Sequence, residues 1–434
     1  MTHEGAMYIR RVVLKGIKGF DEADLSFNVE GRYPGWAVIT GDNSSGKTAL
    51  LKAISLALLG PEQTRSLVPD LRGWVTEGKT VGTASVEISP DHEFDKTRSG
   101  GNPVRSTFWA EIQIDRDDPL YKISSADIFR NKKKSATNGP WAQSTQGWFA
   151  LGYGPFRRLY GSSPDAQRLM MLPGRIPRFA TLFKEDATLG EGEEWVKQLN
   201  YRRLESREGK RDSHEPGGAV LDALLQVLND DFLRQGIRIE EVDSDGIWLR
   251  DSADRRMPLS DMSDGYRSAV AMLIDIFRHM VDVYGPNDLV RKEEDTYLVA
   301  RPGVVMIDEI DSHLHPAWQR EVGFWLTRHF PQVQFIVTTH SPLVCQAADS
   351  GRIYHLPQPG EGPPFLIARE QFQHIISGRP DEILLTPAFG LSHTRSPRAV
   401  TARIRHARLT AKQRGGGNLD ESETKELQQL ELFV

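Results

Sequence analysis

The chain has 434 residues, of which 39% are hydrophobic and 26% are charged, and its formal net charge is −5. This length and composition are typical of a globular protein with two or three domains, or with one large domain that carries insertions. The small acidic excess argues against a generally basic nucleic-acid binder, but it does not exclude a local basic patch.

The sequence shows no signal for export or membrane insertion. Cys345 is the single cysteine, which excludes an intrachain disulfide and a cysteine zinc cluster and fits a reducing compartment. The N-terminus lacks a signal-peptide pattern, and no apolar run of about 18 residues occurs. We therefore expect a cytoplasmic protein without a membrane span.

The N-terminal segment predicts strands followed by a glycine loop and a helix. Strands are expected at about 7–14, 25–29 and 36–40, and the last of them stops at Gly41. A helix is expected over 49–59, where Gly60 and Pro61 form a stop signal.

The middle of the chain changes character. Strands are expected within 84–88, 108–114 and 148–153, and helical patterns follow at 192–205 and 218–235. Residues 237–250 return to a strand pattern. The helical part between these strands predicts an inserted lobe.

From residue 258 onward an alternating pattern appears. Helices at 264–284 and 316–329 alternate with apolar strands at 304–307 and 334–338, which predicts a largely parallel sheet with a site at the carboxyl ends of its strands. Residues 365–434 are expected to be helical, with an arginine-rich stretch at 395–414 and an acidic helix at about 421–432.

The glycine loop carries the most specific motif. It reads Gly41-Asp42-Asn43-Ser44-Ser45-Gly46-Lys47-Thr48, which matches the phosphate-binding pattern G-x-x-x-x-G-K-[ST] between a strand and a helix. Backbone N–H groups of such a loop and the N-terminus of its helix face phosphate oxygens. We expect ATP to bind along Gly41, Asn43, Ser44, Ser45 and Gly46, with Lys47 on the β and γ phosphates and Thr48 on Mg²⁺.

The apolar strand at 304–307 ends in two carboxylates, Asp308 and Glu309. In a phosphate-loop protein such a strand is expected beside the loop, where Asp308 would complete the Mg²⁺ shell. Glu309 would orient and deprotonate the attacking water. Alone, this pattern usually marks only the end of a strand, and the upstream glycine loop is what makes it specific.

The strand at 334–338 leads to His340. A lone histidine is usually structural, but this one follows a core strand where the γ phosphate is expected. An imidazole at that place can donate a hydrogen bond to the phosphate.

The segment Met262–Ser268 opens the helix predicted at 264–284. Ser263 and Gly265 can present a hydroxyl and backbone N–H groups to an anion. A plain N-cap by Ser263 or Asp264 explains the same residues, so this segment alone does not decide.

Together these four segments resemble the ABC-type ATPase heads of the SMC, RecF and OLD group, and the resemblance covers about residues 7–357. It implies an α/β P-loop NTPase with an ABC-ATPase-like head, made of a mixed sheet plus a parallel core sheet, with an inserted helical lobe and C-terminal helices. The implied domains are 1–154 and 237–364 for the two parts of the head, 155–236 for the lobe, and 365–434 for the C-terminal helical region.

In that group two heads enclose two ATP molecules. The resemblance therefore implies a homodimer or higher homo-oligomer, in which Ser263 and Gly265 meet the γ phosphate of the ATP that the other subunit binds. It also implies that Asp311 lies at the dimer interface, and it favours packing or interface roles over metal binding for His313 and His315.

The chain departs from the group at two points. The signature reads Ser-Asp-Gly-Tyr at 263–266, where transporter ATPases have Ser-Gly-Gly. The glutamine that couples the lobe to the nucleotide is not evident, since Gln143 and Gln146 precede the strand at 148–153. The sequence leaves this coupling open.

A narrower resemblance rests on the segment Tyr153–Arg157, on Leu182-Phe183 with Trp195, and on Phe389-Gly390-Leu391. These segments look like the stand-alone bacterial AAA-family ATPases of anti-phage systems of the Septu kind. That group acts beside a separate nuclease, which implies an ATPase that controls a partner effector.

Three other functions compete with this interpretation. A DNA repair or recombination ATPase would clamp DNA, and the arginine-rich stretch at 395–414 is its clearest basic candidate, although a solvated or partner-docking helix explains it too. A built-in TOPRIM nuclease is disfavoured because fewer than about 100 residues follow His340. A transporter subunit is disfavoured by the signature and by the unclear glutamine.

Overall fold

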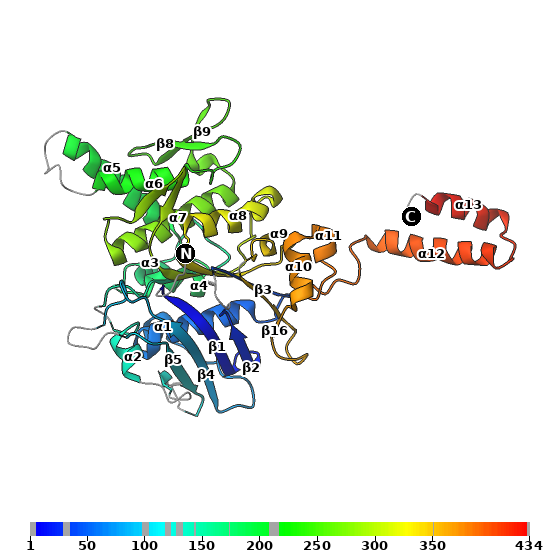
Figure 1. Ribbon diagram of the computed structural model, residues 1–434, viewed down its shortest axis with the longest axis horizontal. Coiled ribbons are helices and arrows are strands. Elements are labelled where there is room, and N and C mark those ends of the chain that lie inside the picture. Colours follow the sequence, from blue (N-terminus) through cyan, green and yellow to red (C-terminus); the bar gives the residue numbers. More distant parts are fainter. Residues whose placement is uncertain are drawn as a thin grey trace.

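The computed structural model (Figure 1) describes residues 6–28, 35–97, 104–117, 123–126, 133–142, 145–172, 174–207, 217–349 and 351–431. Gln143, one of the two glutamines considered above, lies outside these residues. Two sheets organise the fold, with the helix that follows the glycine loop packed between them.

The central sheet has six strands in the order β16-β15-β3-β14-β13-β7. Five strands are parallel, and β16 runs antiparallel to β15 at one edge. The strands are β3 (Trp36–Gly41), β7 (Ala150–Tyr153), β13 (Gly303–Ile307), β14 (Val333–Thr338), β15 (Arg352–Leu356) and β16 (Phe365–Leu366). Strand β14 pairs with both β3 and β13, and it therefore separates the strand before the glycine loop from the strand before Asp308.

The second sheet is antiparallel, with the order β2-β1-β4-β5-β6. Its strands are β1 (Tyr8–Ile17), β2 (Phe20–Ser26), β4 (Val81–Ser89), β5 (Phe108–Asp115) and β6 (Ile123–Ser125), and the short helix α2 (Lys133–Asn138) packs near β5. Helix α1 (Lys47–Leu67) contacts β4 and β5 of this sheet as well as β3 and β7 of the central one.

Four strands of the central sheet, β3, β7, β13 and β14, are mostly apolar and are buried at every position. Successive side chains of a strand point to opposite faces, and the core divides accordingly. Ala37 and Ile39 of β3 pack with α1 and the antiparallel sheet, whereas Trp36 and Val38 pack with the helices on the other face. The predicted fold class, an α/β P-loop architecture with a parallel core sheet, is confirmed.

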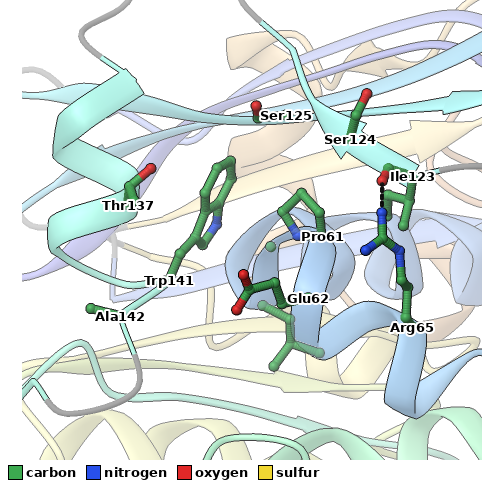
Figure 2. A pocket seen from close by; sticks show the side chains of 11 residues that line it. Pro61, Glu62, Arg65, Ile123, Ser124, Ser125, Thr137, Trp141 and Ala142 are labelled. Atoms are coloured by element: carbon green, nitrogen blue, oxygen red, sulfur yellow. Dashed lines mark hydrogen bonds between the residues drawn. The ribbon is translucent and has the colours of Figure 1, made fainter.

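Helix α1 is kinked at the predicted stop signal, and a further short helical stretch follows the kink. Gly60 has a φ of 76°, and a Cβ there would meet the Trp141 ring at 2.6 Å. Pro61 has no N–H for the carbonyl of Ala57, so the Trp141 indole donates to that oxygen at 2.8 Å instead. Figure 2 shows this indole beside Pro61.

The other face of the central sheet is covered by helices. They are α5 (Gly190–Arg207), α6 (Gly217–Leu228), α7 (Asp264–Tyr284) and α8 (Pro316–His329). Helices α7 and α8 have the predicted bounds, whereas α6 ends seven residues before the predicted position 235. The chain turns there through residues with positive φ, among them Asp231, Gln235 and Gly236.

Shorter elements connect and flank these helices. They are α3 (Pro164–Met170), η1 (Pro177–Phe179), α4 (Ala180–Phe183), η2 (Leu259–Asp261), the sheet of β8 (Arg238–Val242), β9 (Ile247–Arg250) and β10 (Arg256–Pro258), and the hairpin of β11 (Val290–Glu293) and β12 (Thr296–Val299). Side chains of α5 and α6 share one hydrophobic core with α7, α8 and the central sheet. The proposed domain limits stay a prediction.

The C-terminal region is helical apart from β16, as predicted. It contains α10 (Arg369–Ser377), α11 (Pro380–Ile383), α12 (Pro397–Arg414) and α13 (Glu421–Leu430), and the short helix α9 (Pro342–Cys345) precedes it in the chain. Helices α12 and α13 form a hairpin that projects away from the rest of the chain (Figure 1). The segment 391–396 that leads to it is exposed throughout.

Candidate functional site

The glycine loop joins β3 to α1 in a conformation that two of its glycines make possible. Gly46 has a φ of 95°, and a Cβ there would lie 2.7 Å from the ring of Phe20. Gly41 has a φ of 150°, and a Cβ there would lie 2.6 Å from the carbonyl oxygen of Leu356. Side chains at these positions would force the loop apart, so the sequence pattern has a steric cause here.

The Lys47 ammonium lies inside this loop. It donates to the carbonyl oxygens of Gly41 and Asp42, both at 2.8 Å. Burial lowers the pKa of Lys47, and the nearby carboxylates of Asp308 and Glu309 act in the opposite direction. The structure therefore brings the lysine and both predicted carboxylates to one place.

The remaining loop residues differ in exposure. Ser45 is buried, and its Oγ has no hydrogen-bond partner within the part of the chain that the structure describes. Ser44 and Asn43 are exposed, and Ser44 has a φ of 68°. The Asn43 carbonyl accepts from the Gln358 side chain at 3.0 Å. An orphaned hydroxyl within a loop that tolerates no Cβ at either glycine fits an anionic oxygen ligand.

Thr48 and Asp308, the two predicted Mg²⁺ ligands, are in direct contact. The Thr48 hydroxyl donates to Asp308 Oδ2 at 2.5 Å, and the Thr338 hydroxyl donates to Oδ1 at 2.6 Å. Asp308 is fully buried, and burial raises its pKa while the two hydroxyl hydrogen bonds lower it. Oxygen ligands of this kind suit Mg²⁺, which typically takes one or two protein oxygens besides phosphate oxygens and water.

Glu309 follows in a left-handed backbone conformation, with a φ of 46°. Its N–H donates to the Thr338 hydroxyl at 2.7 Å, and its Oε2 accepts from the Ser312 hydroxyl at 2.9 Å. Thr338 thus bridges Asp308 and Glu309. Sequence analysis missed this threonine, and its only signal was its place as the last residue of a core strand.

His340 lies just beyond β14 and is exposed, next to a buried polar turn. In that turn the Thr339 hydroxyl donates to Asp311 Oδ1 at 2.5 Å and accepts from the Ser341 N–H at 2.9 Å. The structure therefore places His340 at the rim of the site. It also ties Asp311 to the same strand end.

Ser263 and Gly265 begin α7, away from the loop. Ser263 is the N-cap residue and makes no side-chain capping bond. A Cβ on Gly265 would lie 2.2 Å from the His313 carbonyl oxygen. In the described part of the chain neither residue hydrogen-bonds to the glycine loop, and their contact with a phosphate stays a prediction.

A second residue that sequence analysis missed is Arg157. It is 5% exposed, and its guanidinium donates to the carbonyl oxygens of Gly154, Asp308 and Glu309 at 3.2, 2.8 and 3.1 Å. In the sequence it is the last residue of the segment Tyr153–Arg157, which carries a family resemblance but predicted no role for the guanidinium.

A cavity beside α1 is separate from this site. It has a volume of about 700 Å³ and lies at the kink, between Pro61, Arg65 and Trp141 (Figure 2). Lys47 precedes Gly60, the residue at the kink, by 13 residues, which corresponds to roughly 20 Å along the helix axis. The chemistry-bearing residues meet at the glycine loop, so the site is there.

The fold and the site define an α/β P-loop NTPase. A family described as "AAA domain, putative AbiEii toxin, Type IV TA system" matches residues 37–346, and the chain belongs to this family.

Several curated proteins are similar to the chain. A Septu protein PtuA of Bacillus mycoides (strain KBAB4) is 24% identical over 348 residues, which cover 80% of this chain and 40% of that protein. The "Retron Ec83 probable ATPase" of Escherichia coli is 42% identical over 95 residues, covering 22% of this chain and 16% of that protein. The chain thus spans less than half the length of these relatives. The resemblance to AAA-family ATPases of the Septu kind is confirmed.

Solved structures of Smc head domains are also similar. A head from Pyrococcus furiosus, bound to the C-terminal domain of ScpA, has 15% identity, coverage of 85% of this chain and 98% of that chain, and a TM-score of 0.46. The head from Thermotoga maritima has 14% identity, coverage of 83% and 99%, and a TM-score of 0.43. Among the described residues, no helix has the length and apolar character that crossing a bilayer requires.

Proposed function

We propose that this chain binds ATP with Mg²⁺, hydrolyses the ATP to ADP and phosphate as a homodimer, and regulates a separate effector, a nuclease, in bacterial anti-phage defence. One observation carries the enzymatic part. The Thr48 hydroxyl donates to the Asp308 carboxylate at 2.5 Å, although β14 separates the strand before the glycine loop from the strand before Asp308. The buried Lys47 ammonium lies in the loop beside them.

The glycine loop would hold the phosphates through its backbone N–H groups, and Lys47 would exchange its two carbonyl partners for phosphate oxygens. Thr48 and Asp308 would hold Mg²⁺, which when bound neutralises charge on the phosphate oxygens.

Glu309 would accept the proton of the attacking water. Its backbone is held by Thr338 and its side chain by Ser312, so the carboxylate keeps one orientation without solvent reorganisation. His340, exposed at the rim beyond the same strand end, would donate a hydrogen bond to the γ phosphate.

A second copy would complete the site. Ser263, whose hydroxyl makes no capping bond, is the N-cap residue of a 21-residue helix, and Gly265 lies in the first turn of that helix. We propose that they meet the phosphates held by the other subunit, and that Asp311 and the segment around His313 lie at that interface. The contact between Gly265 and the His313 carbonyl places the helix start beside this segment.

The defence role is supported by the kind of relatives, which include Septu and retron proteins. The projecting α12–α13 hairpin and the α5–α6 region are the proposed contact elements for the effector. ATP binding would close the dimer and hydrolysis would reset it, which is a two-state switch biased by the γ phosphate.

The enzymatic proposal is tested by measuring phosphate release from ATP and Mg²⁺. We expect steady turnover by the unaltered chain and no measurable turnover by Lys47→Ala or by Ser263→Arg alone. A mixture of the two variants should recover part of the activity, because one composite site then has both intact halves. A mixture without ATPase activity would count against composite sites. An unaltered chain without activity would count against ATP hydrolysis.

One observation favours a second function, a DNA repair or recombination ATPase. Helix α12 carries six of the chain's lysine and arginine residues: Arg398, Arg403, Arg405, Arg408, Lys412 and Arg414. Two of these pair with acidic side chains of α13, which lowers the charge available to phosphates. Duplex binding that weakens steeply with salt, and that truncation of α12 abolishes, would favour this alternative.

A further inference from the structure

The connection after β7 carries a buried cation with unusual partners. Arg157 is 5% exposed, and its guanidinium donates from Nη1 to the carbonyl oxygen of Asp308 at 2.8 Å and from Nη2 to that of Glu309 at 3.1 Å. Two nitrogens of one planar group thus hold two consecutive carbonyls. A lysine ammonium cannot match such a fork.

The same connection holds β13 from a second side. The Asp308 N–H donates to the Tyr153 carbonyl at 2.8 Å, and the Tyr153 hydroxyl donates to Asp275 Oδ2 of α7 at 2.8 Å. Arg157 also donates to the Gly154 carbonyl at 3.2 Å, which closes its own loop onto the strand end. The segment 153–157 is therefore a clamp on residues 308–309.

Glu309 needs such a clamp because its backbone is left-handed, with a φ of 46°, a region that disfavours residues with a side chain. Its N–H is held by Thr338 and its carbonyl by Arg157. These two hydrogen bonds hold the peptide groups before and after the Cα atom of Glu309. Releasing either one would let the backbone relax and turn the carboxylate away.

The charge of Arg157 also suits this place. Burial lowers the pKa of the guanidinium to about 10, and the carboxylates of Asp308, Asp311 and Glu309 raise it, so the group stays charged at neutral pH. A buried cation is costly unless its surroundings compensate. Here three nearby carboxylates stabilise the positive charge, while backbone carbonyls accept the hydrogen bonds of the guanidinium.

We propose that Arg157 is a positioning residue for hydrolysis: it pins the carbonyls of Asp308 and Glu309, holds Glu309 in its left-handed conformation, and so aims the carboxylate that activates water. This inference rests on the proposed ATPase function. It also gives the connection between β7 and the following helices a coupling residue, a role for which the sequence shows no clear glutamine.

Steady-state hydrolysis and equilibrium ATP binding of Arg157→Gln and Arg157→Lys test the inference. We expect kcat to fall about 100-fold in Arg157→Gln, because a misplaced catalytic group costs about that much, while the Kd for ATP changes less than about threefold. Arg157→Lys should recover only a small part of the loss, since its flexible point charge lacks the fixed planar spacing of the two guanidinium nitrogens.

The matched control is Arg175→Gln, which removes another buried guanidinium whose Nη2 donates to the Thr145 hydroxyl at 2.8 Å. It should leave kcat within about twofold in the folded fraction. Equal kcat losses in the two variants would mean that burial of an arginine, rather than positioning, sets the rate, and would overturn the inference.

A double variant isolates the path through Glu309. In the Glu309→Gln background, Arg157→Gln should lower the residual rate by less than about threefold, because the group that it positions is already gone. A further 100-fold loss would contradict the inference. If the unaltered chain does not hydrolyse ATP, the proposed function fails; if it does and Arg157→Gln keeps full kcat, only the positioning role fails.

Discussion

The nucleotide site and the α12–α13 hairpin are built in opposite ways. At the site, Thr48 and the adjacent pair Asp308 and Glu309 come from separate segments and are held by hydrogen bonds at the ends of the buried strands β13 and β14. In the hairpin, Ala402 and Leu409 are the buried side chains among the described residues of both helices. Its cross-helix ion pairs, Arg405–Glu426 and Lys412–Glu423, are exposed to solvent.

This difference matches the two proposed roles, ATP hydrolysis at the site and contact with an effector at the hairpin. Exposed ion pairs stabilise little, and isolated helices of this length are marginal in water. The hairpin therefore has little packing of its own, and stable order would have to come from a partner surface. The site needs no such help for its arrangement, although a second copy is proposed to complete it. The following predictions test how independent the two regions are.

The largest effect is expected at Glu309. Glu309→Gln removes the proposed base but keeps the shape of the side chain, so kcat should fall by roughly 10²–10⁴-fold. Because ATP then persists, gel filtration with ATP and Mg²⁺ should show a dimer or higher assembly that the unaltered chain forms only transiently. An elution volume that ATP does not change would contradict closure by nucleotide.

The next effect concerns His279, which is buried on α7 in the core that supports the site. Burial lowers its pKa from 6.5 to about 4; the facing charges include Asp275, which raises the value, Arg278 and Arg178, which lower it further, and Asp282, whose Oδ2 lies 3.8 Å from Nδ1 of His279. The His279 imidazole binds a proton below about pH 6.5 in the unfolded chain, but only below about pH 4 in the folded chain. Stability should thus be present above pH 6.5 and be lost towards pH 4, by up to about 3 kcal/mol.

Thermal midpoints measured between pH 7 and pH 4 check this. His279→Gln should flatten the dependence on pH relative to the unaltered chain. Substitution of His393, which is exposed next to the hairpin, should leave the slope as it is. Equal slopes for the His279 variant and the unaltered chain would show that the acid sensitivity has another source.

A smaller effect is expected at Gly265. A Cβ there would press on the His313 carbonyl at 2.2 Å, so Gly265→Ala should destabilise the fold by about 1–3 kcal/mol without nucleotide. Ser263→Ala is the matched control at the same helix start, since the Ser263 side chain makes no capping bond and its loss should barely move the midpoint. An unchanged midpoint in Gly265→Ala would argue that the helix start moves freely.

The smallest effect on the site is expected from removing the hairpin. A chain that ends at Thr394 should keep its thermal midpoint and its ATP hydrolysis rate within about twofold, because the segment before the hairpin is exposed and its helices add little to the core. Binding of the effector should be lost instead. A large loss of hydrolysis would mean that the two regions are not independent.

Much of the fold followed from local patterns. Helices α7 and α8 have the predicted bounds because apolar periodicity and N-terminal signals act within one segment. The glycine loop could be assigned from eight residues, since its steric demands are local. The order of the strands could not, because β14 also pairs with β3, where Trp36 and Phe335 are partners although they are about 300 residues apart in the chain. The roles proposed for the site residues stay predictions.

By itself the sequence determined the phosphate loop, the acidic pair Asp308 and Glu309, and the alternation that yields a parallel sheet. Only the tertiary structure decided that Thr338 bridges this pair, that Arg157 clamps it, and that Gly265 must be small against His313. The physical reason is the distance along the chain over which each interaction acts. Periodicity, glycine sterics and turn chemistry act between near neighbours, whereas the partners of a buried polar group are chosen by the packing of segments far apart in the chain.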